Sequence, residues 1–189
     1  MNQTRKLLLK LGIFWWVTAV VLTACTGEPA DAPTTVGVPG VTLSDETGAQ
    51  LGQIAPDFTV PTLDGRSYTL TDNNGKPAII FFMAYWCGSC VPEARALAQL
   101  QQEYGDAVNI IAIDLDTSST PELLRPFKEA ADDGDFTWGF DSDNQVALTY
   151  EVQALDTTLV LDSNGHVVFR DAFPTTYDQL NTVLEQLGL

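Results

Sequence analysis

Continuous and periodic apolar segments divide the chain from residue 51 onward into short strands and helices. Residues 78–83 are an unbroken apolar run and residues 108–115 are a largely apolar one, a pattern typical of strands buried on both faces of a sheet. Between them, residues 91–104 repeat apolar side chains at helical spacing, so an amphipathic helix is predicted there. This order of strand, helix and strand indicates an α/β domain.

Turn signals predict the strands at the two ends of the domain. Asp64-Gly65 separates two short strand-like segments and predicts an N-terminal β-hairpin. Asn164-Gly165 separates two further strands and predicts a second hairpin. Helix and strand patterns add a helix beginning near Pro121, a strand over 136–140, a short helix over 143–150 and a terminal helix over 177–187. The predicted fold is α/β: a central mixed β-sheet flanked by helices, with an N-terminal β-hairpin extension.

The first 24 residues have the composition of a targeting segment. Three basic residues precede an apolar stretch that ends in Leu22-Thr23-Ala24-Cys25. Small residues before a cysteine resemble a bacterial lipoprotein signal, which predicts removal of residues 1–24 and lipidation of Cys25. The alternative is an uncleaved anchor helix, because residues 7–24 are nearly long enough to span a bilayer. Both interpretations predict an extracytoplasmic, membrane-anchored protein.

Residues 25–50 are rich in Pro, Gly, Thr and Asp and have little apolar periodicity. This composition predicts a flexible tether, followed by a single domain over residues 51–189.

The charge balance excludes one class of partner. The chain has 25 acidic residues against 9 Lys and Arg, a formal charge of −16. Removing residues 1–24 takes away three positive charges and no acid, so the mature charge is −19. With no basic surface to neutralise phosphates, nucleic acid is not an expected partner.

The segment Trp86-Cys87-Gly88-Ser89-Cys90 carries the candidate chemistry. It follows the predicted strand 78–83 and opens the predicted helix 91–104. A helix N-terminus supplies unpaired N–H groups and a positive dipole end, which stabilise a thiolate. If Cys25 carries lipid, the remaining two cysteines form a self-contained pair. The hypothesis is a thiol–disulfide exchange centre.

Three motifs together resemble the thioredoxin-fold redoxin family, and more narrowly its TlpA/ResA-like membrane-anchored thiol–disulfide oxidoreductases. They are the opening segment 52–58, the cysteine motif and the hairpin segment 162–168. The resemblance implies disulfide exchange with protein substrates, participation in cytochrome c maturation as one setting for it, and a membrane thiol electron donor. It also implies that no organic cofactor is bound, because the cysteine pair itself carries the electrons. Reductase is the direction that the resemblance favours, although the sequence does not decide it.

The resemblance also implies roles for individual residues. Cys87 is expected to be the partly exposed attacking thiolate and Cys90 the resolving thiol. Trp86 is expected to shape the approach to them. Glu93 matches an acidic residue that tunes the cysteines or relays protons; the alternative is a solvated carboxylate in the first turn of the helix.

Two positions depart from the family pattern. Ser89 replaces the proline common between the cysteines. Asp156, just before Thr157, stands where the family has a cis-proline facing the disulfide. A cis bond before a non-proline residue is costly, so a trans bond is expected. Asp156 either faces Cys87 and acts on its proton and charge, or turns into solvent.

Metal binding and peroxidase activity are two alternatives to redox exchange. Cys87 and Cys90 are also suited to copper or zinc, with Asp156 as a third ligand. His166, the only histidine, is expected at the surface or on an edge strand and is not assigned as a ligand. Peroxidase activity is not expected, since peroxiredoxins have a threonine three residues before the reactive cysteine and Ala84 stands there.

Overall fold

The computed structural model describes residues 38–73 and 75–189. The predicted lipoprotein signal, Cys25 and the first half of the predicted tether lie outside these residues. Within the described part of the chain, no helix is both long and apolar enough to cross a membrane.

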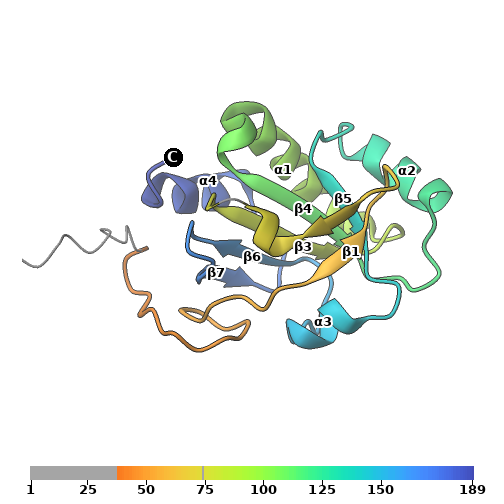
Figure 1. Cartoon of the computed structure of the whole chain (residues 1–189). Coiled ribbons are helices and arrows are strands. Elements are labelled where there is room, and N and C mark those ends of the chain that lie inside the picture. Colours follow the sequence, from red (N-terminus) through yellow and green to blue (C-terminus); the bar gives the residue numbers. More distant parts are fainter. Residues whose placement is uncertain (1–37, 74) are drawn as a thin grey trace, which may run out of the picture. The chain divides into compact units, whose positions relative to one another are not determined.

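A five-stranded mixed β-sheet forms the centre of the domain, in the order β5-β4-β3-β6-β7 (Figure 1). Its strands are β3 (Ala78–Met83), β4 (Asn109–Asp114), β5 (Thr137–Phe140), β6 (Thr157–Leu161) and β7 (Val167–Asp171). Strands β3, β4 and β5 are parallel, whereas β6 and β7 are antiparallel to their neighbours. The predicted mixed sheet is therefore confirmed, with β3 at its centre because this strand is buried along its whole length.

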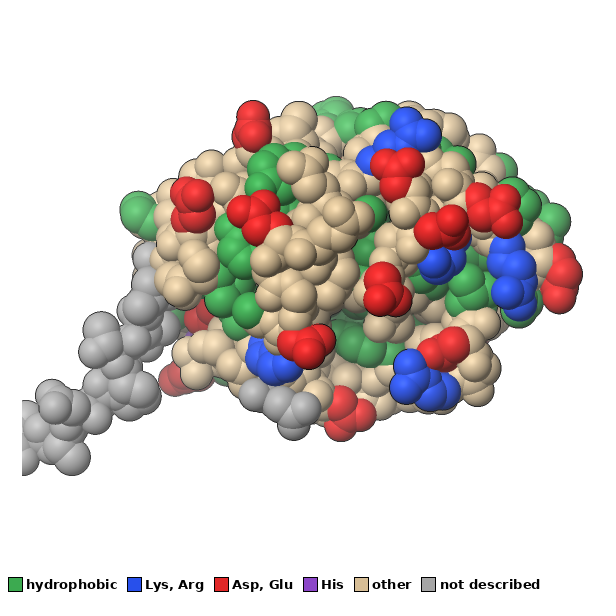
Figure 2. Space-filling view, turned by 90° about the horizontal axis from the view of Figure 1, so that it is seen from above, with side chains coloured by type: hydrophobic (Ala, Val, Ile, Leu, Met, Phe, Trp, Pro, Cys, Tyr) green, Lys and Arg blue, Asp and Glu red, His purple; other side chains and the backbone are tan. Residues whose placement is uncertain are grey.

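Helices cover both faces of the sheet. They are α1 (Val91–Tyr104), α2 (Pro121–Ala130), α3 (Gln145–Thr149) and α4 (Tyr177–Gln186), with shorter 3-10 turns η1 (Leu70–Asn73), η2 (Gly88–Cys90) and η3 (Gly105–Ala107). Side chains of β3 alternate between two cores: Ile79 and Phe81 pack with α1, α2 and α4, while Ile80 and Phe82 pack with α3 and the N-terminal segment. Figure 2 shows acidic side chains scattered over the surface on the α1 side, in keeping with the net charge.

The predicted N-terminal hairpin consists of β1 (Thr59–Pro61) and β2 (Ser67–Thr69) and lies against the edge strand β5. The Leu63 N–H donates to the Trp138 carbonyl oxygen at 2.8 Å. Gly139 permits this close approach, because a Cβ there would lie 2.9 Å from Val60 Cγ2. On the opposite edge, Val167 of β7 exchanges backbone hydrogen bonds of 2.8 Å with residues 52 and 53.

The predicted boundary between tether and domain at residue 51 was placed too late. Ala49 is buried, and the Gly48 N–H donates to the Ile54 carbonyl oxygen at 2.9 Å. The Arg170 guanidinium reaches from β7 and donates to the Ala49 carbonyl oxygen at 3.0 Å. The last residues assigned to the tether therefore belong to the folded domain, since a polar, Gly-containing segment can be held by backbone contacts without apolar periodicity of its own.

Candidate active site

The cysteine pair lies between the end of β3 and the start of α1, as the sequence predicted. Cys87 and Cys90 form a disulfide with Cα atoms 5.4 Å apart. The turn η2 holds them in place through a hydrogen bond of 3.1 Å from the Cys90 N–H to the Cys87 carbonyl oxygen. Gly88 and Ser89 are exposed on the outside of this turn. Cys87 is more buried than expected, at 6% exposure, and Cys90 is fully buried.

Trp86 is exposed beside the disulfide and is held by the loop after β4. Its indole Nε1–H donates to Asp116 Oδ2 at 2.7 Å. Asp116 is oriented in turn by Asp114, whose Oδ1 accepts the Asp116 N–H at 3.0 Å. Asp114 is fully buried, and this burial raises the pKa of its carboxyl group. The indole is thus fixed next to the cysteines, where it can shape the approach of another molecule.

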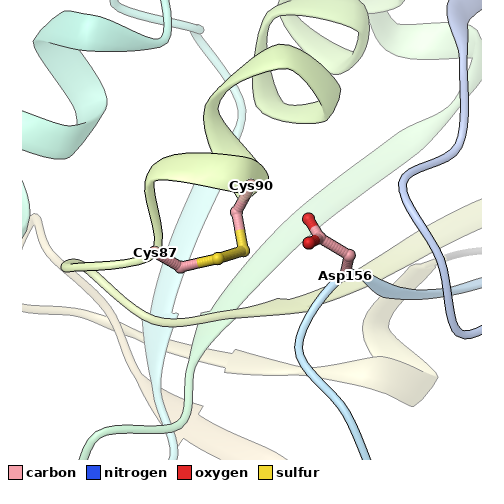
Figure 3. Close-up of side chains that lie close together, drawn as sticks. All are labelled: Cys87, Cys90 and Asp156. Carbon is pink, nitrogen blue, oxygen red and sulfur yellow. A yellow bond between two sulfur atoms is a disulfide. The ribbon is translucent and has the colours of Figure 1, made fainter.

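The carboxyl group of Asp156 points toward the disulfide (Figure 3). It is only 5% exposed, so the alternative that it turns into solvent was wrong. The preceding peptide bond is trans, as expected, and Asp156 adopts a φ of 60° in the left-handed region. Thr157 stabilises this turn by donating from Oγ1 to the Ala154 carbonyl oxygen at 2.7 Å. Burial raises the pKa of the Asp156 carboxyl, and a hydrogen bond from Ser89 partly opposes that rise.

A hydrogen bond joins Ser89 and Asp156, the two positions that depart from the family pattern. Ser89 Oγ lies 3.3 Å from Cys87 Sγ and donates to Asp156 Oδ2 at 3.1 Å. Oδ1 of the same carboxylate is buried and has no hydrogen-bond partner. The serine and the aspartate therefore act as one unit, with the serine hydroxyl between the carboxylate and the sulfur of Cys87.

Glu93 is buried at 1% exposure in the first turn of α1, so the solvated alternative was wrong. Its Oε1 accepts from Thr158 Oγ1 at 2.5 Å, and its Oε2 accepts the Thr175 N–H at 2.9 Å. Burial raises the pKa of Glu93 to about 7; both hydrogen bonds oppose this rise, and the charge of Asp156 adds to it. The carboxyl group can therefore change its protonation state near neutral pH.

His166 lies apart from this site, in the hairpin before β7. Its Nδ1 is 3.4 Å from Asp162 Oδ2, and the imidazole is half-buried. The sequence did not identify Asp116, Thr158 or Thr175 as neighbours of site residues. They are 30, 65 and 82 positions from the residues they contact, and pairing across such separations leaves no local signal in the sequence.

Comparison with known proteins agrees with this geometry. Residues 51–170 match the AhpC/TSA family. The chain belongs to this family. It is 35% identical over 121 residues to the thioredoxin-like protein YneN of Bacillus subtilis, covering 64% of this chain and 70% of that one. It is 31% identical over 157 residues to a thiol-disulfide oxidoreductase ResA of Bacillus cereus, covering 80% of this chain and 89% of that one.

Solved structures of the same fold include related redox proteins. A protein assigned as the thiol:disulfide interchange protein DsbE from Chlorobium tepidum superposes with a TM-score of 0.63 at 26% identity, covering 78% of this chain and all of that one. The domain therefore has a thioredoxin-like fold. Together with the cysteine pair at the start of α1, these relationships identify this member of the AhpC/TSA family as an enzyme, a thiol–disulfide oxidoreductase.

Proposed function

We propose that the Cys87–Cys90 couple reduces disulfides in protein substrates. The observation that carries this proposal is the position of the pair, which closes a disulfide at the N-terminus of α1 in a thioredoxin-like fold. In the reduced protein the Cys87 thiolate attacks one sulfur of a substrate disulfide, which forms a mixed disulfide and releases the other substrate sulfur as a thiolate. The Cys90 thiolate then attacks the Cys87 sulfur and releases the second substrate thiolate. The oxidised couple accepts two electrons from a donor dithiol to complete the cycle.

The buried carboxylate of Asp156 supports the reducing direction. When ionised, it opposes negative charge on the sulfurs that it faces. Couples become strong oxidants when their reduced thiolate form is stabilised. We therefore expect a reduction potential closer to that of thioredoxin, about −270 mV, than to that of DsbA, about −120 mV. Glu93, with its raised pKa, is the second carboxyl group proposed to tune the pair.

Exchange assays with defined variants test this assignment. Wild-type protein is expected to reduce insulin with dithiothreitol as electron donor, in buffer containing EDTA. Cys87→Ser is expected to abolish exchange, and Cys90→Ser to accumulate a mixed disulfide with the substrate. Undiminished insulin reduction by Cys87→Ser would overturn the roles given to the two cysteines.

A redox titration against glutathione tests the direction. Asp156→Asn removes the charge at nearly constant shape, and its potential is expected to be higher than that of the wild type. A wild-type reduction potential of about −120 mV, like that of DsbA, contradicts the reductase proposal.

We also propose that the protein acts outside the cytoplasm on a lipid anchor at Cys25. The basic residues, the apolar stretch and the small residues before Cys25 support this. The disulfide of apocytochrome c is a proposed substrate, and a membrane protein with a dithiol is the proposed electron donor. Cys25→Ser is expected to prevent lipid attachment, as read by mass spectrometry of the N-terminal peptide. An unmodified, uncleaved N-terminus in the wild-type protein would favour an anchor helix instead.

A further inference from the structure

One group of side chains in the described part of the chain has the composition of a metal site. Ligand atoms of Cys87, Cys90 and Asp156 lie within 4.8 Å of one another, and all three residues are buried. Asp156 Oδ1 is buried without a hydrogen-bond partner. An unpaired carboxylate oxygen in the interior costs free energy, and such atoms call for an explanation that includes a bound ion.

We propose that the reduced cysteine pair and Asp156 together bind one Zn²⁺ ion, and that formation of the disulfide releases it. Zinc accepts thiolate and carboxylate ligands in tetrahedral sites, and Cys-x-x-Cys is a common spacing for two of its ligands. Bond lengths of about 2.3 Å to sulfur and 2.0–2.2 Å to oxygen place tetrahedral ligand atoms about 3.5–3.8 Å apart. The two sulfurs are bonded to each other in the oxidised protein, and reduction frees them to take up this separation within the 4.8 Å that the three groups span.

The ligand set favours zinc over other ions. Two thiolates exclude Mg²⁺ and Ca²⁺, which prefer oxygen ligands, and the hard carboxylate is a poor ligand for Cu(I). Two thiolates and one carboxylate carry three negative charges, of which Zn²⁺ neutralises two. With three protein ligands, the fourth position of a tetrahedral site remains open to water or another ligand.

Metal binding and disulfide exchange are linked through the same sulfur atoms. Zinc binding to two thiols releases two protons. Oxidation by a substrate disulfide then forms the Cys87–Cys90 bond, passes two electrons and two protons from solution to the substrate as two thiols, and frees Zn²⁺. Because only the reduced form binds the ion, zinc raises the reduction potential by about 30 mV for each tenfold gain in stability of the reduced form.

Zinc titrations of the full-length protein in detergent, under anaerobic conditions, test the proposal. Reduced protein, freed of metal by chelation, is titrated with Zn²⁺ against a chromophoric chelator, and Co²⁺ is used as a spectroscopic probe of thiolate ligation. One equivalent is expected to bind to the reduced protein and none to the oxidised protein. The oxidised protein retains Cys25, so the difference between the two forms reports on the active-site pair alone.

Two variants distinguish a residue that binds the metal from a residue that only contacts a metal ligand. Asp156→Asn is expected to weaken zinc binding by at least about tenfold, the lower end of what loss of a supporting partner costs at metal sites. Ser89→Ala removes the hydrogen bond to Asp156 and keeps all three ligands, so it is expected to weaken zinc binding less than Asp156→Asn does. Circular dichroism and quantitative disulfide formation confirm that each variant is folded.

Several results overturn the proposal. They are equal zinc affinity of wild-type and Asp156→Asn proteins, binding to the oxidised form, or a site that takes only Cu(I) through the two sulfurs. The inference requires a reducible cysteine pair but not exchange with proteins. Insulin reduction in EDTA tests the proposed disulfide reduction without metal. Failure of the zinc proposal can therefore be distinguished from failure of the proposed function.

Discussion

Glu93 tests how much the ionisation of a buried carboxyl group lowers the free energy of unfolding of this protein. Its carboxyl group is 1% exposed and accepts hydrogen bonds from Thr158 and Thr175. Glu93→Gln keeps the shape of the side chain and mimics the protonated acid. The amide can donate to Thr158 Oγ1, while its carbonyl oxygen still accepts the Thr175 N–H.

The expected effect follows from the pKa of Glu93, which burial raises from 4.5 to about 7. Between these pH values the folded protein holds a proton that the unfolded chain has lost, so the free energy of unfolding falls as pH rises. A shift of roughly 2.5 pKa units at 1.36 kcal/mol per unit is worth about 3 kcal/mol. This stability is present below about pH 4.5 and is lost by about pH 8. Glu93→Gln is therefore expected to be up to about 3 kcal/mol more stable than wild type at pH 8, with little difference at about pH 4.5.

Urea unfolding of the oxidised protein at several pH values from about 4.5 to about 8 measures this difference. Glu129→Gln, which removes an exposed glutamate from α2, serves as the matched control and is expected to follow the wild-type curve. Parallel curves for wild type and Glu93→Gln across this range would refute the reasoning. They would mean that water or relaxation of the surrounding residues solvates the ionised carboxylate.

Three further experiments, with four variants, probe other contacts. Ser89→Ala and Asp156→Asn are expected to shift the reduction potential non-additively, with a coupling of about 0.5–3 kcal/mol, because one hydrogen bond joins them; additive shifts contradict the link. Arg170→Ala removes the hydrogen bond that holds the carbonyl of residue 49, so limited proteolysis is expected to cleave within 38–50 faster, and an unchanged rate argues against this anchoring. Tyr150→Phe deletes a buried hydrogen bond to a backbone carbonyl and is expected to cost about 1 kcal/mol in urea unfolding; no loss would show that water replaces the phenol.

The sequence predicted most of the fold because its signals are local. The apolar run of β3, the Asn164-Gly165 turn and the helical spacing of α1 each need only neighbouring residues to be recognised. It also placed the cysteine pair, since a strand-to-helix junction is visible in the same way. The burial of Glu93 and the orientation of Asp156 were left open. Both depend on partners 65 or more positions away, and a side chain's partner in space leaves no periodic trace.

The outer edges of the sheet are occupied by one stretch of chain, residues 52–63. Residues 52 and 53 bond to β7 at one edge, and Leu63 bonds to β5 at the other. Open sheet edges are where foreign strands add and where aggregation begins. A peptide substrate therefore cannot extend the sheet at these positions without displacing the protein's own backbone. The end of the sheet that carries the disulfide is left free for contact with a substrate.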